Sequence, residues 1–542
     1  MNYAQHFNPS STPQTEQADP RQVKNNAGGF SFQLDVWKRL DRWLILGAEG
    51  GTYYASERKL TRDNAKTILE CLALDAGRTV ETIASVSESG RAPKNDAAIF
   101  ALALACADKN ASSIALHAVP RVCRIGTPLF HFVAAVESMR GWGPALRKAV
   151  ARWYSERTPD QLCYQLAKYQ QRDGWSHRDL LRLSHAKPKP EHAPIYRWAT
   201  GNELGARSVP GNDKRSRKAR EYASVGELPA FLAAFDELKT ADQKRTIALI
   251  REQGFTHEMI ATHHKNSADV WEALLEKMPP TAMIRNLAKM TTVGLIKPLS
   301  SVLPSIAERL TDEAALKKAR VHPIQMLSAL MVYRQGHGEK GSLKWDPVPQ
   351  IIDALDAGFY SAFGAIEPSG KRLMLAIDVS GSMGNGTIAG VPGLNPRMAA
   401  AAMAMVTART EKQWHVISFG HQLRSLPITP RMRLDDVVTM LSGWDGGRTD
   451  CAIPMIAAEH NALDVDCFCV YTDNETWAGN IHPHQALESY RRARVTDARM
   501  AVIGMTATDF TIAKPDDPGM LDVVGFDTAT PNILADFARG GV

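Results

Sequence analysis

Three oxygen-bearing side chains stand at alternate positions directly after an apolar run. In the segment KRLMLAIDVSGSM (371–383), Asp378, Ser380 and Ser382 follow residues 373–377, which are apolar on both faces of an expected strand. This pattern is typical of a central strand of a parallel sheet, which is buried on both sides. One carboxylate and two hydroxyls are hard oxygen donors, and these suit Mg²⁺ better than a soft metal. We therefore predict a divalent-cation site, with Mg²⁺ as the expected ion, at the carboxyl end of this strand.

Two downstream segments supply further candidate ligands for this cation. Thr449 lies in the turn GGRTD (446–450) before a helical run, and Asp473 ends a second apolar strand, DVDCFCVYTD (464–473). In a doubly wound sheet the carboxyl ends of the strands meet at the switch point, so Asp378 and Asp473 should converge there. The alternative is a serine-rich turn with an unrelated acid nearby. The order of strand, D-x-S-x-S, threonine turn and strand ending in Asp favours the metal site.

The composition is that of an ordinary globular chain. Hydrophobic residues make up 44% and charged residues 23% of the 542 positions, enough for two or three domains. No apolar run is long enough for a transmembrane helix, and the polar segment 1–29 has no signal core, so a loosely held N-terminal arm is expected. Seven cysteines without a C-x-x-C pair argue against a disulfide scaffold or a zinc site. We therefore expect a reduced, cytoplasmic protein.

The apolar periodicity divides the chain into two parts. Residues 30–366 show helical spacing in successive runs of 10 to 16 residues with short connections, which predicts an all-α solenoid of helix pairs. Residues 367–542 alternate short apolar runs with helical ones, which predicts an α/β domain with a mostly parallel sheet. The turn-rich link Glu367-Pro368-Ser369-Gly370 marks the boundary.

The helical part contains a segment in which cations alternate with rings, LAKYQQRDGWSHRDLLRLSHAKPKP (166–190). Lys168 and Arg172 are four residues apart, so they should share one helix face. Cations that follow the backbone and rings that stack on bases are what a single-stranded RNA channel uses. The alternative is an ordinary basic helix pair with Trp175 in its core. The candidate RNA-binding cations of this segment are Lys168, Arg172, Arg178, Arg182 and Lys187, with His185 as a further polar ring.

The net charge of +6 permits nucleic-acid binding without requiring it. A second basic run at 205–220 is either a solvated loop or another RNA-touching segment, and its role stays open.

Several motifs in order resemble the Ro autoantigen family, in which a TROVE domain precedes a von Willebrand factor A domain. They include GWGPALRKAVARWY (141–154), MPPTAMIRNLAKMT (278–291), YRQGHGEKGSLKWDP (333–347) and EPSGKRLMLAIDVSGSM (367–383). The D-x-S-x-S turn resembles the first half of the metal-ion-dependent adhesion site, or MIDAS, of A domains. The resemblance implies a ring of HEAT-like helical repeats (30–366) whose ends are joined by the A domain (367–542), in a monomer.

The resemblance also implies a function in noncoding-RNA stability and quality control. Single-stranded 3′ ends of misfolded structured RNAs would enter the central channel, and Y-type small RNAs would bind the outer basic surface. Comparable bacterial proteins associate with exoribonucleases such as polynucleotide phosphorylase, which is therefore a candidate partner. Lys168, Arg172 and His185 match the family's RNA-contacting positions. The further basic candidates in matching regions are Arg121, Arg124, Arg140, Arg147 and Lys148.

Two other functions remain open at this point. The A domain could be a Mg²⁺-dependent protein-adhesion module, in which the ion keeps one coordination position for a partner's carboxylate. A Mg²⁺-dependent nuclease centred on Asp378 and Asp473 is less favoured, because two-metal chemistry needs more clustered carboxylates. The sequence shows no nucleophile elbow, P-loop or H-E-x-x-H motif, so a noncatalytic protein is expected. Arg448 separates the glycine pair from Thr449, a departure from the family pattern whose effect on the metal site is open.

Overall fold

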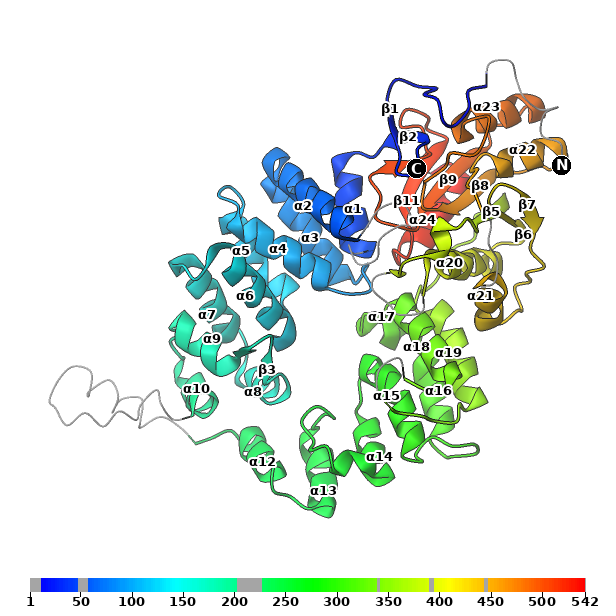
Figure 1. The fold of residues 1–542 in the computed structure, drawn as a ribbon. Helices are drawn as coiled ribbons and strands as arrows, with labels where there is room; N and C mark the ends of the chain where they lie inside the picture. Colours follow the sequence, from blue (N-terminus) through cyan, green and yellow to red (C-terminus); the bar gives the residue numbers. More distant parts are fainter. Residues whose placement is uncertain are drawn as a thin grey trace.

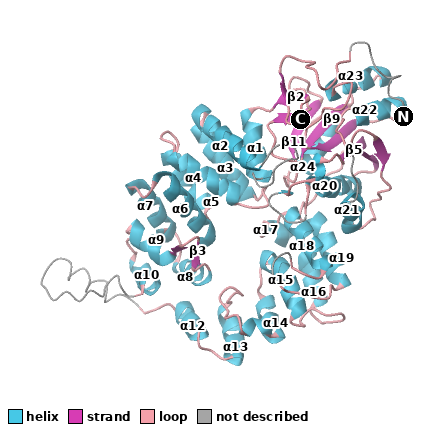
Figure 2. Ribbon diagram, in the orientation of Figure 1, coloured by secondary structure: helices cyan, strands magenta, loops and turns pink. Residues whose placement is uncertain are grey.

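The computed structural model describes residues 11–46, 57–201, 227–338, 342–388, 394–442 and 447–541. Helices make up the first part of the chain, and strands are concentrated in the last part and in the N-terminal segment beside it (Figure 2). The predicted fold class, a helical-repeat part followed by an α/β domain, is confirmed. The basic run at 205–220 lies outside the described residues.

The helical part is a succession of short antiparallel helices with local capping signals. Asp75 accepts a hydrogen bond from the amide of Arg78 at the start of the third helix, and Gly90 ends that helix with a φ of 72°. The helices are α1 (Val36–Leu46), α2 (Glu57–Leu74), α3 (Ala76–Ser89), α4 (Asp96–Ala107), α5 (Ser112–Val122), α6 (Gly126–Arg140), α7 (Pro144–Ser155), α8 (Pro159–Lys168), α9 (His177–Ser184), α10 (Ala193–Thr200), α12 (Ala230–Leu238), α13 (Gln243–Gln253), α14 (Ala268–Glu276), α15 (Pro280–Thr292), α16 (Leu303–Thr311), α17 (Glu313–Lys318), α18 (Pro323–Gln335) and α19 (Pro349–Ser361).

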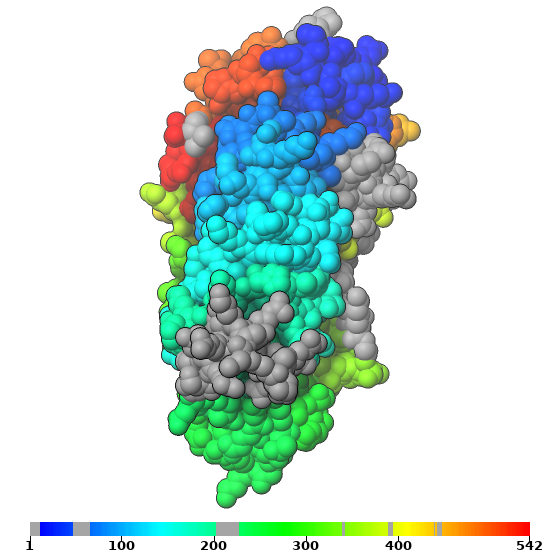
Figure 3. Space-filling model, turned by 90° about the vertical axis from the view of Figure 1, so that its left-hand side faces the viewer, coloured from blue at the N-terminus to red at the C-terminus, as the bar shows by residue number. Residues whose placement is uncertain are grey.

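Each helix packs on its neighbours in sequence, as in a solenoid. Seen from the side, the chain passes in order from blue through cyan to green along the molecule (Figure 3). Large apolar side chains such as Phe130, Trp153 and Trp271 are completely or almost completely buried between the helices. Burial of this kind, rather than helix propensity, stabilises helices of this length.

The two ends of the helical part meet, so the helices and the A domain follow a closed circuit (Figure 1). We call the meeting of residues 88–93 with residues 320–325 the seam. Across it, Arg320 Nε donates to the carbonyl oxygen of Glu88 at 2.6 Å, and Gln325 Nε2 donates to that of Pro93 at 3.0 Å. These contacts join helical repeats more than 230 residues apart in the chain. They agree with the predicted ring.

The A domain contains a six-stranded sheet with the order β11-β9-β8-β5-β6-β7. All neighbouring strands are parallel except the edge pair β6 and β7, so the sheet is mixed. The chain moves outward on one side of β5 and then returns to its other side at β8, which places the switch point between these two strands. The strands are β5 (Arg372–Asp378), β6 (Gln413–Phe419), β7 (Leu423–Ser425), β8 (Cys467–Thr472), β9 (Arg499–Gly504) and β11 (Met520–Val524); the helices are α20 (Pro396–Thr410), α21 (Leu434–Ser442), α22 (Ile453–His460), α23 (Pro483–Arg494) and α24 (Thr530–Arg539).

The expectation of a loosely held N-terminal arm is wrong for residues 11–29. Strand β1 (Gln22–Lys24) pairs with β2 (Phe30–Gln33), which pairs in turn with β10 (Phe510–Thr511) of the A domain. The buried Gln14 side chain donates to Asp450 Oδ1 at 2.7 Å and accepts from Thr476 Oγ1 at 2.6 Å. Polar composition suggested an unattached arm, but these polar groups are satisfied by hydrogen bonds to a distant part of the chain.

The helix that was expected to carry both Lys168 and Arg172 ends between these two residues. Helix α8 ends at Lys168, and residues 171–176 form a small hairpin of β3 (Gln171–Arg172) and β4 (Trp175–Ser176). Asp173 and Gly174 adopt φ values of 52° and 78° in its turn. Lys168 and Arg172 therefore do not share a helix face, and that prediction is wrong.

No helix within the described ranges is long and apolar enough to span a membrane.

Candidate metal and RNA sites

The predicted metal ligands of β5 and β8 converge at the switch point. Asp378 Oδ2 accepts a hydrogen bond from Thr472 Oγ1 at 2.7 Å, and its Oδ1 accepts one from the amide of Ser380 at 2.9 Å. The hydroxyls of Ser380 and Ser382 lie 3.1 Å apart. The hydroxyl of Ser382 opposes the effect of burial on the pKa of Asp473. One connected group of oxygen atoms thus links the two strand ends.

Both carboxyl groups of this cluster are fully buried. Burial, followed by the nearby charge of Asp473, raises the pKa of Asp378 to about 7. Burial likewise raises the pKa of Asp473 above its ordinary value. Two buried carboxylates destabilise each other when both are ionised, and a cation between them would remove that repulsion.

Two oxygen atoms of the cluster lack a protein partner. Among the described residues, Thr449 Oγ1 and Asp473 Oδ2 are buried without a hydrogen-bond partner. The amide of Gly381 donates to the carbonyl oxygen of Gly447 at 3.1 Å, which holds the threonine turn against the D-x-S-x-S turn. Buried oxygen atoms without donors are the ligands that a hard cation would satisfy. The donor set of Asp378, Ser380, Ser382, Thr449 and Asp473 therefore fits Mg²⁺ in kind.

Arg448 does not displace Thr449 from the site. The Arg448 side chain is exposed, and its guanidinium lies over the ring of Trp477 at 5.4 Å from the centroid. Thr449 itself is fully buried. The inserted residue is therefore accommodated on the surface, while the threonine hydroxyl stays inside.

Lys168, the first of the predicted RNA contacts, is held by protein groups. Its Nζ lies 3.1 Å from the hydroxyl of Tyr164 and 3.6 Å from Glu258 Oε1, and its side chain is 9% exposed. Burial alone would lower the pKa of Lys168, but two neighbouring tyrosines and Glu258 outweigh burial and raise it. The ammonium group therefore already has an anionic neighbour within the protein.

Arg172 and His185 present exposed groups on either side of α9. The Arg172 side chain is 61% exposed, and its Nε lies 3.9 Å from Asp173 Oδ1. His185 ends α9 in the left-handed conformation with a φ of 52° and is exposed. The hairpin that carries Arg172 and helix α8 lie at the inner side of the helical arc (Figure 1).

The other basic candidates divide by their surroundings. Arg121 is bound by two carboxylates, at 2.6 Å from Glu81 and 2.7 Å from Glu88. Arg124 donates to Ser87 Oγ at 3.0 Å, and Arg140 donates to Ser112 Oγ at 2.6 Å. These arginines join neighbouring helices. The exposed members are Lys148, Arg178, Arg182 and Lys187, and Arg147 is partly buried.

Sequence reasoning missed the residues that surround Lys168. Glu258 is 90 positions away and follows the first histidine of the segment THEMIATHH (256–264). In the structure His257 Nδ1 lies 3.1 Å from Glu258 Oε2, beside the lysine. Packing between α8 and the helices that follow it along the arc brings these groups together, so local spacing carried no signal for them.

Comparison with known proteins agrees with the two-part architecture. The TROVE domain model matches residues 23–253 and 244–331, and the Ro60 vWA domain model matches residues 372–538. The chain belongs to the Ro family. This Ro-family chain is similar to the RNA-binding protein RO60 of Deinococcus radiodurans, with 42% identity over 99% of both chains. It is also similar to the RNA-binding protein RO60 of Caenorhabditis elegans, with 37% identity over 98% of this chain and 92% of the relative.

A solved structure has the same fold. The crystal structure of the Deinococcus radiodurans Ro (RSR) protein matches 94% of this Ro-family chain and 100% of its own, with a TM-score of 0.67 and 39% sequence identity.

Proposed function

We propose that this protein is a noncatalytic RNA-binding ring of noncoding-RNA stability and quality control. Single-stranded 3′ ends of misfolded structured RNA would bind along the inner side of the helical arc. The observation that carries the proposal is the position of the β3–β4 hairpin, which presents the exposed Arg172 at that inner side. Family membership supports it, because the relatives are RNA-binding proteins by name.

Y-type small RNAs would bind the outer basic surface. The exposed cations Lys148, Arg178, Arg182 and Lys187 lie on or after α7 and α9, two helices that pack against each other. Clustered cations that are not buried bind phosphates at little desolvation cost. An exoribonuclease such as polynucleotide phosphorylase is a proposed partner for the RNA delivered by this ring.

The A domain is proposed to hold one Mg²⁺ ion on Asp378, Ser380, Ser382, Thr449 and Asp473. All five side chains are at most 2% exposed. A buried site of this kind supports a role of the ion in folding the switch point rather than in binding a partner's carboxylate. Two carboxylates and three hydroxyls also offer less charge than two-metal nuclease chemistry needs.

Binding of a structured RNA with and without a single-stranded 3′ tail tests the function. The variant Lys168→Ala/Arg172→Ala/His185→Ala should lose tail-dependent, salt-sensitive binding. A matched control removes one exposed lysine, arginine and histidine outside the basic segment, Lys244→Ala/Arg251→Ala/His263→Ala. Binding that does not depend on the tail, or that both variants retain, would contradict the proposal.

A further inference from the structure

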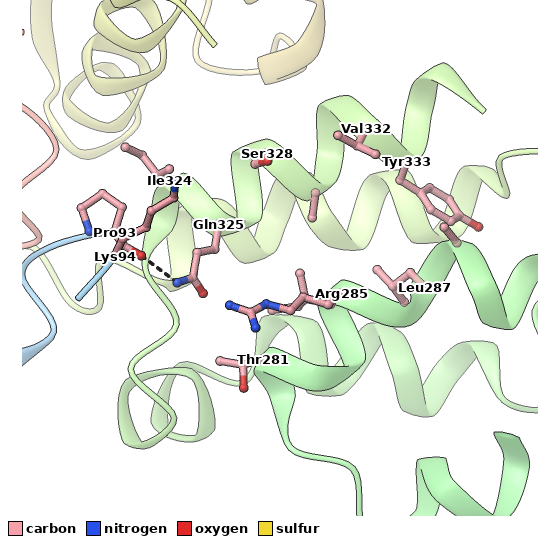
Figure 4. Close-up of a pocket in the computed structure, with 13 residues that line it drawn as sticks. Pro93, Lys94, Thr281, Arg285, Leu287, Ile324, Gln325, Ser328, Val332 and Tyr333 are labelled. Carbon is pink, nitrogen blue, oxygen red and sulfur yellow. Dashed lines mark hydrogen bonds between the residues drawn. The ribbon is translucent and has the colours of Figure 1, made fainter. Parts of the chain in front are cut away.

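A cavity of about 370 Å³ lies at the seam, between helices α15 and α18 and the segment that follows α3 (Figure 4). Pro93 and Lys94 close one end, Arg285 belongs to α15, and Gln325 belongs to α18. The hydrogen bond from Gln325 to the carbonyl oxygen of Pro93 crosses the cavity wall. The cavity is therefore formed jointly by residues from both sides of the seam.

The two ends of this seam cavity differ in polarity. Lys94, Thr281, Arg285 and Gln325 lie toward the end at which the segment after α3 approaches, whereas Leu287, Val332 and Tyr333 lie toward the other end (Figure 4). The hydroxyl of Tyr333 is bonded to Thr291 at 2.8 Å, so Tyr333 offers the cavity its ring rather than its polar atom. A ligand with an anionic end and an apolar end would complement both ends of this space.

Arg285 is the cation of the cavity that is best placed to bind an anionic ligand. It is exposed and has no hydrogen bond or ion pair within the part of the chain that the structure describes. Other arginines of the helical part, such as Arg121 and Arg309, are bonded to carboxylates or carbonyl oxygens. A planar guanidinium in a half-enclosed, apolar-walled cavity favours a bidentate oxyanion such as a phosphate.

We propose that the seam cavity binds a single nucleotide, with its phosphate at Arg285 and Lys94 and its base against Leu287, Val332 and the ring of Tyr333. The cavity volume lies in the range of small-ligand pockets. A purely apolar ligand would leave Arg285 desolvated and unpaired, and inorganic phosphate alone would leave the apolar end to water. The nucleotide can be the 3′-terminal residue of a bound RNA or a free mononucleotide, and the first source rests on the proposed function.

Residues from both sides of the seam line the cavity, so a bound ligand would contact both sides and hold the ring closed. Binding to the closed form alone stabilises that form by mass action. Occupancy would therefore protect the amides of residues 88–95 and 320–326 from hydrogen exchange.

The test uses 5′-AMP and a structured RNA with a single-stranded 3′ tail, each titrated into the full-length protein and three variants. Arg285→Gln removes the guanidinium, and Ala329→Leu fills the cavity without changing charge, since Ala329 is a partly exposed lining residue. Lys318→Glu, an exposed charge reversal on α17 away from the cavity, is the control. A second RNA carries an abasic site at its 3′ end.

Saturable AMP binding that weakens at least about tenfold in Arg285→Gln and in Ala329→Leu, but not in Lys318→Glu, is the expected result. If the unmodified protein binds the abasic RNA more weakly than the intact RNA, and the cavity variants bind both RNAs equally, the natural occupant is the terminal nucleotide of the RNA. If the unmodified protein binds the two RNAs equally, the natural occupant is a free nucleotide. AMP and RNA affinities that both cavity variants leave unchanged would overturn the proposal. Loss of tail-dependent RNA binding in every protein would contradict the proposed function, while the AMP titration would still decide the cavity.

Discussion

His322 Nε2 donates a hydrogen bond to the carbonyl oxygen of Arg91 at 3.0 Å, although the two residues are 231 positions apart. The other ring nitrogen, Nδ1, accepts a hydrogen bond from the amide of Ile324 at 3.1 Å. Both nitrogens of a neutral imidazole are thus satisfied in the seam. Arg91 in turn lies 2.6 Å from Asp527 of the A domain, so one residue connects both helical ends to the closing domain.

Lowering the pH should weaken this closure. Burial lowers the pKa of His322 to about 4 from an ordinary value near 6.5. Because the unfolded chain takes up a proton at higher pH than the folded one, the stability is complete above pH 6.5 and is lost as the pH falls toward 4. The loss from this residue is on the order of 3 kcal/mol.

Urea unfolding between pH 4 and 7 measures that loss. His177 and His484 have pKa values lowered in the same direction by burial, so the pH dependence must be compared with His322→Gln. This variant keeps a donor for Arg91 but does not titrate. A variant whose stability declines with pH as steeply as that of the unmodified protein would refute the role of His322.

The buried ion pair between Arg42 and Asp522 should be the strongest single link between helix α1 and the A domain. Their side chains are 1% and 3% exposed, and Nη2 lies 2.5 Å from Oδ1. Removing one partner leaves a buried charge unpaired, so Arg42→Ala should lower the free energy of unfolding by about 3–5 kcal/mol. Chemical denaturation measures it, with Arg245→Ala, which breaks only exposed pairs, as a control that should change stability little.

Magnesium should stabilise the protein through the oxygen cluster at the switch point. A cation at one hundred times its dissociation constant adds about 2.7 kcal/mol to the free energy of unfolding. Asp473→Asn should abolish the gain, because Asp473 Oδ2 is one of the buried oxygens without a partner. Thermal unfolding with and without EDTA measures the effect. Asp466→Asn, at the other end of the same strand, should retain it, and an equal gain in both variants would place the ion elsewhere.

Glu258 should weaken RNA binding at the inner surface. Its carboxylate lies 3.6 Å from the Nζ of Lys168 and would compete with a phosphate for that cation. Glu258→Gln should therefore tighten the binding of a single-stranded tail by about three- to tenfold at low salt. Arg172→Ala should instead reduce the salt slope by about 0.7 to 1 unit, the loss of one phosphate contact.

Fluorescence titrations across salt concentrations measure both effects. Glu276→Gln, which removes an exposed carboxylate paired with Arg251, is the matched control for Glu258→Gln. A Glu258→Gln variant with unchanged affinity would show that Lys168 does not contact RNA.

The sequence alone predicted much of the A domain. The strand expected at 373–377 lies within β5, and the strand expected within 464–473 agrees with β8. Continuous apolar runs are a local signal, since a central parallel strand is buried on both faces. The convergence of Asp378 and Asp473 was also predictable, because strand order alone determines where carboxyl ends meet.

The RNA-binding cations were less predictable. Spacing suggested that Lys168 and Arg172 lie on one helix, but the turn at Asp173 and Gly174 separates them. Charge also did not reveal which arginines join helices, as Arg121 does with Glu81 and Glu88. The sequence shows that a residue is basic. Whether its side chain can bind RNA depends on the neighbouring side chains, which come from other helices.

The sequence by itself thus determined the helical class of the first part, the central strands and the oxygen-bearing side chains at the ends of those strands, because periodicity and short-range spacing are local properties of the chain. Only the tertiary structure decided that residues 11–33 join the A domain, that the seam closes through His322 and Arg91, and that a cavity forms beside Arg285. The physical reason is that each of these depends on hydrogen bonds or packing between residues far apart in sequence. Such contacts form only after the whole solenoid has curved back onto its own beginning.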